Sequence, residues 1–113
     1  MKSVIKVGNL RSVLHFQLEK EVENDTFGKD IEWCDVFKTR GNVRTTSGLI
    51  WRRDASQEPS TTHIITIRFD DRFKRGMRVQ ENCINYTIHK AVILEHHRQR
   101  YLELHCEQEE VFV

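Results

Sequence analysis

Apolar and polar residues alternate one by one along much of the chain, which is typical of β-strands with one buried face. Leu14, Phe16 and Leu18 are each separated by a single polar residue. The clearest strand is residues 62–69, whose β-branched side chains occupy both faces, as expected near the middle of a packed sheet. Further alternating stretches begin at Ile31, Met77, Ile84 and Tyr101.

Two features interrupt this alternation in the first half of the chain. Residues 19–30 are polar and contain Asn24, Asp25 and Gly28, which predicts a loop or a wide hairpin turn. Gly41 falls inside an alternating run, where a bulge or a bend is the usual explanation.

The alternation also stops in the second half of the chain. Residues 45–60 are irregular and hold Pro59, and a single helical turn over residues 49–55 is possible there. Asn82 accepts positive φ readily, which favours a turn at this position. The polar run 95–100 predicts the turn before the last strand.

About six strands joined by turns predict an all-β fold, either a small antiparallel β-barrel or a sandwich. The 113 residues suit one domain, and no linker or internal repeat divides them. Hydrophobic residues make up 38% of the chain, which is enough for one modest core. We therefore expect a single domain over residues 1–113.

The charge balance argues against a protein whose main task is to grip nucleic acid. Lys and Arg number 18 against 17 Asp and Glu, whereas phosphate binding normally requires a basic excess. Residues 72–78, with an aromatic ring between cations, are the best candidate for a nucleic-acid contact. The alternative is a solvated turn beside Asp70 and Asp71, and the balanced charge favours it.

Cysteine usage and hydropathy indicate the compartment. Cys34, Cys83 and Cys106 are odd in number and widely spaced, unlike a secreted disulfide scaffold, so we expect reduced thiols in an intracellular protein. The chain shows neither the apolar core of a signal peptide nor a run near the roughly 18 apolar residues of a membrane helix. We expect a protein made in the cytosol that stays soluble and does not contact a membrane.

No motif indicates catalysis or a metal site. Six histidines are present, but His96 and His97 are adjacent and would face apart on a strand, with no ligand at zinc spacing nearby. Cys106 follows His105 directly, so these two side chains also face apart and do not predict a thiol–imidazole pair. The sequence predicts no enzyme, no metal and no cofactor.

Two surface features suggest protein contacts. Trp51, Arg52 and Arg53 are of the residue types that interface hot spots favour, although Trp51 could instead fold over the core with both arginines solvated. Charge is also unevenly distributed. Residues 19–25 and 107–110 are acidic, whereas residues 72–78 and 98–100 are basic. Such polarity suits subunits that pack head to tail in a ring, but it also arises by chance.

A series of strand motifs is the most specific signal. Residues 8–11 read Gly-Asn-Leu-Arg before an alternating strand, and residues 62–68 read Thr-His-Ile-Ile-Thr-Ile-Arg. The other motifs are Trp33 with Val36 and Val43, Ser47-Gly48, Gly76-Met77-Arg78-Val79, Tyr86-Thr87-Ile88 and the closing run from Tyr101 to Glu107. In order, spacing and length, this series resembles the head–tail joining (head closure, or neck adaptor) proteins of tailed bacteriophages.

The resemblance implies a β-barrel or sandwich with a short helix and a long mobile loop, in a structural subunit of a phage or prophage neck. Copies would form a ring below the portal of a DNA-filled capsid, retain the genome and offer a docking surface to the tail. The implied partners are other copies of the chain, portal or adaptor proteins of the head, and tail proteins. Genomic DNA would pass through a neutral or acidic lumen without specific binding. The implied location is the virion, after assembly in the bacterial host cytoplasm.

Two segments are then expected to form the ring or meet the tail. These are residues 19–30, with Glu21 and Asp25, and residues 45–60, with Trp51, Arg52 and Arg53.

Two alternatives stay open at this point. One is a tail-completion protein of similar fold, which differs only in where the ring sits. The other is a small barrel that binds single-stranded nucleic acid through Phe69, Phe73 and Tyr86 with nearby arginines.

Overall fold

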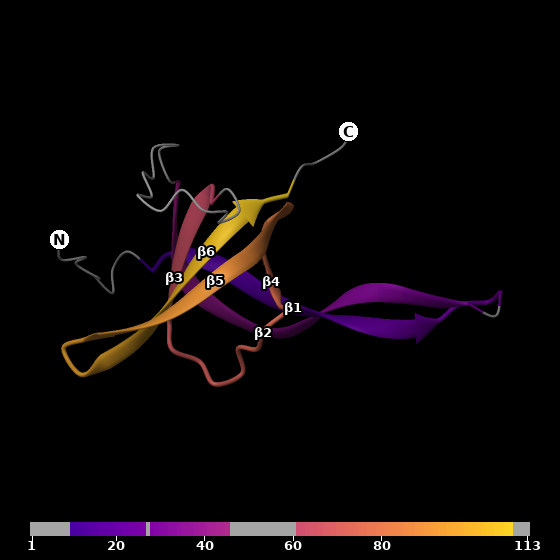
Figure 1. The fold of residues 1–113 in the computed structure, drawn as a ribbon, viewed down its shortest axis with the longest axis horizontal. Coiled ribbons are helices and arrows are strands. Elements are labelled where there is room, and N and C mark those ends of the chain that lie inside the picture. Colours follow the sequence, from indigo (N-terminus) through magenta and orange to yellow (C-terminus); the bar gives the residue numbers. More distant parts are fainter. Residues whose placement is uncertain (1–9, 27, 46–60, 110–113) are drawn as a thin grey trace.

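Six antiparallel strands close into a barrel in the computed structural model, which describes residues 10–26, 28–45 and 61–109 (Figure 1). The order around the barrel is β1-β2-β3-β6-β5-β4, and β4 pairs back onto β1. The strands are β1 (Ser12–Glu23), β2 (Lys29–Thr45), β3 (His63–Arg68), β4 (Arg78–Glu81), β5 (Ile84–His96) and β6 (Gln99–Gln108). The predicted all-β class and strand number are confirmed.

The described residues form no helix, and so none that could cross a membrane. The possible helical turn over residues 49–55 lies outside them, as does all but the first residue of the segment 45–60.

The barrel interior is filled by the side chains that the alternation predicts. Leu14 and Phe16 are fully buried, and the Phe16 ring stacks on Phe37 with the centroids 4.6 Å apart. Strand β3 is buried on both faces, as expected for a central strand. The core consists of Leu14, Phe16, Phe37, Ile65, Ile67, Met77, Val79, Tyr86, Leu102, Leu104 and Cys106.

Two hairpins extend beyond the closed part of the barrel in opposite directions along its long axis (Figure 1). The β1–β2 hairpin projects on one side, and the end of the β5–β6 hairpin projects on the other. Together they lengthen the molecule to 54 Å, against 32 and 25 Å in the other two directions.

Of the two predictions for residues 19–30, the loop is wrong, and the hairpin turn is present but much narrower than predicted. Strand β1 continues to Glu23 and β2 begins at Lys29, so only the short turn between them is irregular. The physical reason is that this part of the hairpin lies beyond the barrel. Polar side chains occupy both faces, and cross-strand backbone hydrogen bonds maintain the strands without an apolar stripe.

The prediction of a bulge at Gly41 is also wrong. Pairing is continuous there, and the register shift lies at Val36, because Phe16 pairs with Phe37 and Gln17 pairs with Asp35. Gly41 is required because the Leu14 side chain and the backbone of β3 approach its Cα too closely to leave room for a side chain. A Cβ at this position would lie 2.6 Å from a methyl of Leu14 and 2.8 Å from the Thr66 carbonyl oxygen.

The two later turns occur where the sequence predicts them. Asn82 adopts φ 55° between β4 and β5, as expected. In the run 95–100 the turn is only two residues long, since His96 pairs with Gln99. Both central residues, His97 and Arg98, have positive φ, at 50° and 65°, which is the pattern of a type I′ hairpin turn.

Candidate functional site

The projecting part of the β1–β2 hairpin, residues 18–23 and 29–34, is called the arm here. Each of its strands pairs only with the other, because β4 joins β1 at residues 15–17 and β3 joins β2 at residues 41–45. The arm is strongly acidic. Together with its turn it carries Glu19, Glu21, Glu23, Asp25, Asp30 and Glu32, against the two lysines Lys20 and Lys29.

The two faces of the arm differ. Cross-strand partners lie on the same face, so Glu19 lies beside Trp33 and Glu21 beside Ile31. We call this face the acidic–apolar face. Ile31 is 63% exposed on it, which is unusual for an isoleucine in an ordered strand. The opposite face carries Lys20, Asp30 and Glu32 together with Leu18, Val22 and Cys34.

The turn at the end of the arm is organised by Asn24. Its Oδ1 accepts hydrogen bonds from the backbone N–H of Gly28 at 2.8 Å and of Thr26 at 3.1 Å. The Asn24 N–H in turn donates to the Gly28 carbonyl at 3.1 Å. Asp25 is exposed on this ordered turn.

A network of polar side chains fixes the base of the arm where β1 leaves the barrel. Gln17 is only 7% exposed, and its Nε2 donates to Asp35 Oδ1 at 2.7 Å. Its Oε1 accepts from Arg78 Nε, also at 2.7 Å. The Arg78 guanidinium lies 4.4 Å from the centroid of the Trp33 ring. The network therefore links β4 to both strands of the arm.

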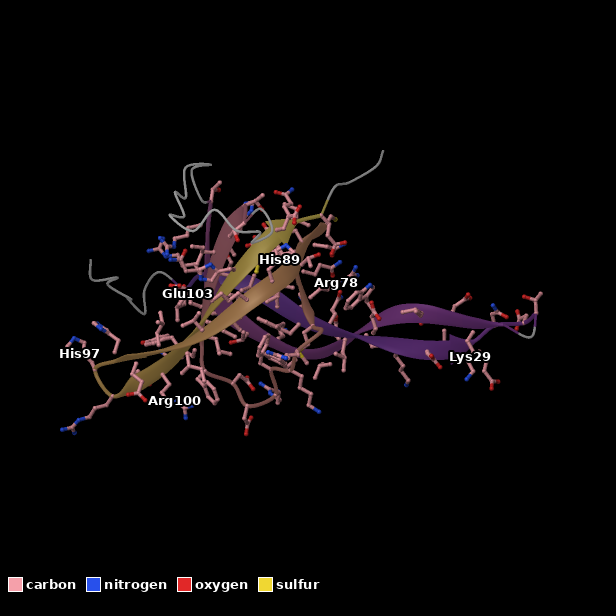
Figure 2. All side chains as sticks on the ribbon, in the orientation of Figure 1. Lys29, Arg78, His89, His97, Arg100 and Glu103 are labelled. Carbon is pink, nitrogen blue, oxygen red and sulfur yellow. The ribbon has the colours of Figure 1, made fainter. Side chains whose placement is uncertain are left out.

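The opposite end of the molecule is basic. Figure 2 shows Arg100 and His97 at the end of the β5–β6 hairpin, far from Lys29 on the arm. Arg98 lies on the same turn, and Glu95 pairs with Arg100 beside it. The loop between β3 and β4 lies nearer the middle of the molecule and carries the exposed side chains of Lys74 and Arg75 as well as Asp70 and Asp71 (Figure 1).

Arg72 on that loop is held by its neighbour. Its Nη2 donates to Asp70 Oδ2 at 2.7 Å, and its Nε donates to Oδ1 at 2.9 Å. These bonds lower the pKa of the Asp70 carboxyl, and burial opposes them with a smaller effect. Arg72 is thus engaged within the loop, whereas Arg75 and Lys90 are exposed, and no described carboxylate forms an ion pair with either.

A hollow lies between this loop and β5, and we call it the basic hollow. It has a volume of about 230 Å³. Its apolar lining includes Phe73, Met77 and Ile88, and Arg75 and Lys90 provide the charge. Strand β4 pairs with β5 only as far as Thr87, so the hollow follows a stretch of β5 that no described strand covers on that side.

The histidines and cysteines are placed without forming a metal site among residues 10–26, 28–45 and 61–109. His89 Nε2 lies 2.9 Å from Glu107 Oε1, and His105 Nε2 lies 3.1 Å from Glu103 Oε1. Cys106 is fully buried, and burial raises the pKa of its thiol to about 12. That thiol therefore stays protonated and unreactive in the folded protein.

The residues expected at an interface divide into two groups. Trp51, Arg52 and Arg53 lie outside the described residues. Glu21 and Asp25 lie on the arm and its turn, and both are exposed.

Sequence reasoning missed Ile31, Arg75 and Lys90 as interface candidates. The signal for Ile31 was an apolar residue between two acids. Arg75 and Lys90 come together across the β4–β5 hairpin, whose register pairs Arg78 with Thr87. The signal that could have found them was the predicted turn at Asn82, which folds β5 back along β4.

The three rings considered for stacking on single-stranded nucleic acid do not form an open platform. Tyr86 is 3% exposed and belongs to the core. Phe69 and Phe73 pack against the core, and the Arg100 guanidinium covers the Phe69 ring at 4.0 Å from its centroid. Base stacking requires free aromatic faces, which this arrangement does not offer.

The fold has a close counterpart among known structures. The solution structure of protein SF1141 from Shigella flexneri 2a matches with a TM-score of 0.68, covering 92% of this chain and 96% of that one. The two sequences are 19% identical, so the likeness establishes the fold alone. The comparison with curated protein sequences gives no match.

The fold defines the chain as a small closed β-barrel protein with two projecting hairpins (Figure 1). The phage head completion protein family matches residues 5–110, so the chain belongs to this family. The resemblance to head–tail joining proteins is confirmed. Membership gives the chain a structural head–tail role as a component of a phage particle, in contact with other phage head or tail proteins.

Proposed function

We propose that the chain is a neck subunit that forms a ring between the portal of the DNA-filled capsid and the tail, and that helps to retain the genome. The whole chain, residues 1–113, acts as one head–tail joining domain. It has no catalytic role. Its partners are its own copies, portal or adaptor proteins of the head, and tail proteins, and the ring is assembled in the bacterial host cytoplasm.

The chain belongs to the head completion family, and the observation that carries the proposal is its pair of hairpins, which project from opposite ends of the barrel (Figure 1). An acidic arm on one end and a basic hairpin on the other give each subunit two different, complementary surfaces (Figure 2). Surfaces of this kind generate head-to-tail assemblies, which close into rings when the rotation between copies permits.

The interface comprises Glu21 and Asp25 on the arm, together with Trp51, Arg52 and Arg53. The ring lumen is neutral or acidic, because a basic lining would hold the phosphate backbone that must slide through. The formal net charge of +1 is consistent with a protein that lets DNA pass without binding it.

Complementation of assembly tests the proposal. The gene is deleted from the inducible phage or prophage, lysates are examined by electron microscopy, and purified protein is added back. We expect separate capsids and tails that join into infectious particles on addition. Normal joined particles without the gene would refute the joining role. Filled heads alongside tails with incomplete ends would instead place the ring on the tail, as in a tail-completion protein.

The interface residues are tested in the same assay. Arg52→Glu combined with Arg53→Glu should impair joining while the circular dichroism spectrum stays that of the native barrel. Unchanged joining by this double variant would remove both arginines from the interface.

A further inference from the structure

We infer that the acidic–apolar face of the arm docks into the basic hollow of a second copy of this chain, with Ile31 inserted among Phe73, Met77 and Ile88. This inference rests on the proposed ring and names the contact that builds it. The occupant is another copy, and the surfaces on both sides of the contact are present in the same subunit.

The arm is the part of the molecule that most needs a partner. An isolated two-stranded ribbon is at best marginally stable in water. The arm has six cross-strand pairs beyond the barrel, no third strand and no covering layer among the described residues. Ile31 is 63% exposed on this ribbon, and covering it removes apolar surface from water.

The basic hollow matches the arm in chemistry. Its floor is apolar, from Phe73, Met77 and Ile88, and suits an aliphatic side chain. Arg75 and Lys90 line it and have no ion-pair partner in the described part of the chain. On the arm, Ile31 lies opposite Glu21, and Glu19 lies one pair along on the same face. Lys29, on this face too, forms an exposed ion pair with Glu21 at 3.5 Å, and Glu19 has no such partner among the described residues. Each side therefore offers an apolar centre with charges of opposite sign.

The geometry does not allow this contact within one subunit. The hollow lies on the barrel, between residues 73–77 and residues 88–91 of β5, and the arm projects away from the barrel (Figure 1). One copy can therefore give its arm to one neighbour and receive the arm of another. This contact is heterologous and repeats from copy to copy, as a ring requires.

Solution NMR on the full chain gives the direct test. Amide shifts of ¹⁵N-labelled protein are followed up to about 1 mM, so that contacts with dissociation constants in the millimolar range are detected. We expect concentration-dependent shifts both on the arm around Ile31 and along the hollow around Arg75 and Lys90. Ile31→Ala should weaken the association, since it removes the apolar centre. An absence of such shifts at this concentration overturns the inference, as do shifts confined to other surfaces.

A charge exchange shows whether the two surfaces contact each other. E19K/E21K reverses the arm face, and R75E/K90E reverses the hollow. Each variant alone should associate at least about tenfold more weakly, because like charges then face each other. The mixture of the two should regain association, since the reversed arm meets the reversed hollow. Failure of the mixture to recover would overturn the pairing of these surfaces.

Matched controls separate a specific contact from general attraction. D30K/E32K makes the charge change of E19K/E21K on the opposite face of the arm, and K38E/R40E makes the charge change of R75E/K90E at exposed positions of β2. Both control variants should associate like the native chain. Equal weakening by D30K/E32K and E19K/E21K would contradict the assignment to one face.

Two further outcomes complete the test. Salt-sensitive shifts of Arg75 and Lys90 with a single-stranded oligonucleotide, without self-association, would assign the hollow to nucleic acid and overturn the inference. Failure here is distinguishable from failure of the proposed function. If E19K/E21K still joins heads to tails in the complementation assay, the neck role stands and the arm contact is wrong. If the native chain is dispensable for joining, the neck role itself fails.

Discussion

The Arg78 guanidinium lies over the Trp33 indole ring, 4.4 Å from its centroid, and its Nε donates to Gln17 at 2.7 Å. One side chain of β4 thereby contacts both strands of the arm at the point where they leave the barrel. Arg78 is mostly buried, with 17% of its side chain exposed. Both contacts are therefore stronger than they would be on a solvent-exposed surface. The orientation of the arm depends on this residue.

Arg78→Ala should lower the free energy of unfolding by about 2 kcal/mol, because the buried Gln17 Oε1 loses its donor and Trp33 loses its cation. Urea titration measures this change, and hydrogen exchange should show faster exchange across residues 18–23. Lys38→Ala, on an exposed position of β2, serves as the control, with a change within about 0.5 kcal/mol. Equal stability of the two variants would contradict the role of Arg78.

Gly41→Ala should destabilise the barrel by about 1–3 kcal/mol, the usual cost of overpacking. The added methyl would meet the Leu14 side chain at 2.6 Å and the Thr66 carbonyl oxygen at 2.8 Å, and the latter is backbone that cannot move aside alone. Thermal unfolding measures the effect. The neighbouring exposed residue gives the control, Arg40→Ala, whose Tm should stay close to that of the native chain. A Tm equally unchanged in Gly41→Ala would show that the strands move apart freely.

Replacing His97 by Asn and Arg98 by Gly should stabilise the protein by about 1 kcal/mol or more. Both residues have positive φ, which costs side chains with a Cβ more than it costs Asn or Gly. The measurement is the midpoint of urea unfolding. His97→Ala combined with Arg98→Ala removes the same side chains without relieving the backbone, so it should bring no gain. Stabilisation by the alanine pair would point to the His96–His97 ring contact instead.

His63 should make the barrel less stable in mild acid. Burial lowers the pKa of its imidazole, and Glu81 opposes this with a smaller effect. The unfolded chain therefore binds the proton more readily than the folded one. The contribution of His63 is complete above the unfolded pKa of about 6.5 and declines as the pH falls below it. His63→Phe retains a ring against Tyr86, 5.0 Å away between centroids.

The measured quantity for His63 is the difference in unfolding free energy between the native chain and His63→Phe, from about pH 8 down to about pH 5. This difference should shift in favour of the variant as the pH falls. A difference independent of pH would show that His63 titrates alike in both states.

Cys106 should resist alkylation while Cys83 reacts. The Cys106 thiol is fully buried with its pKa raised to about 12, whereas Cys83 is exposed. Mass spectrometry after iodoacetamide treatment at about pH 8, where a thiolate is needed for reaction, should find Cys106 labelled only after urea is added. Cys83→Ser should remove the fastest labelling and leave that of the half-buried Cys34. Labelling of Cys106 in the native protein would show that the barrel opens readily.

The strands of the barrel could be predicted from the sequence where one face of the strand packs against the core and the other meets water. Leu14 and Phe16 alternate with polar residues because only one face of β1 meets the interior. The same logic fails on the arm, where both faces meet water and the side-chain pattern no longer reports the strand. It also fails at Val36, where the bulge is set by the pairing of β2 with β1. In the sequence this bulge appears only as two adjacent apolar residues, Val36 and Phe37, which interrupt the alternation.

Of the two surfaces of the candidate interface, only the acidic arm could be predicted from the sequence. The acidic run that includes Glu21 is continuous in sequence, so its charge was visible. The basic hollow combines residues 73–77 with residues 88–91, which meet across the β4–β5 hairpin. The turn at Asn82 was predictable, but the hollow also depends on how the β3–β4 loop packs beyond the end of β4, which no local pattern records.

The seam between β1 and β4 has a consequence for how the chain folds. The β1–β2 and β5–β6 hairpins join residues near in sequence, so each closes only a short loop as it forms. The seam consists of three residue pairs, among them Gln17 with Arg78, which are 61 positions apart. Closing so long a loop is entropically costly and is rewarded by few contacts until the rest is in place. We therefore expect the hairpins to form first and the seam last, so that closure of the barrel is what fixes the direction in which the arm projects.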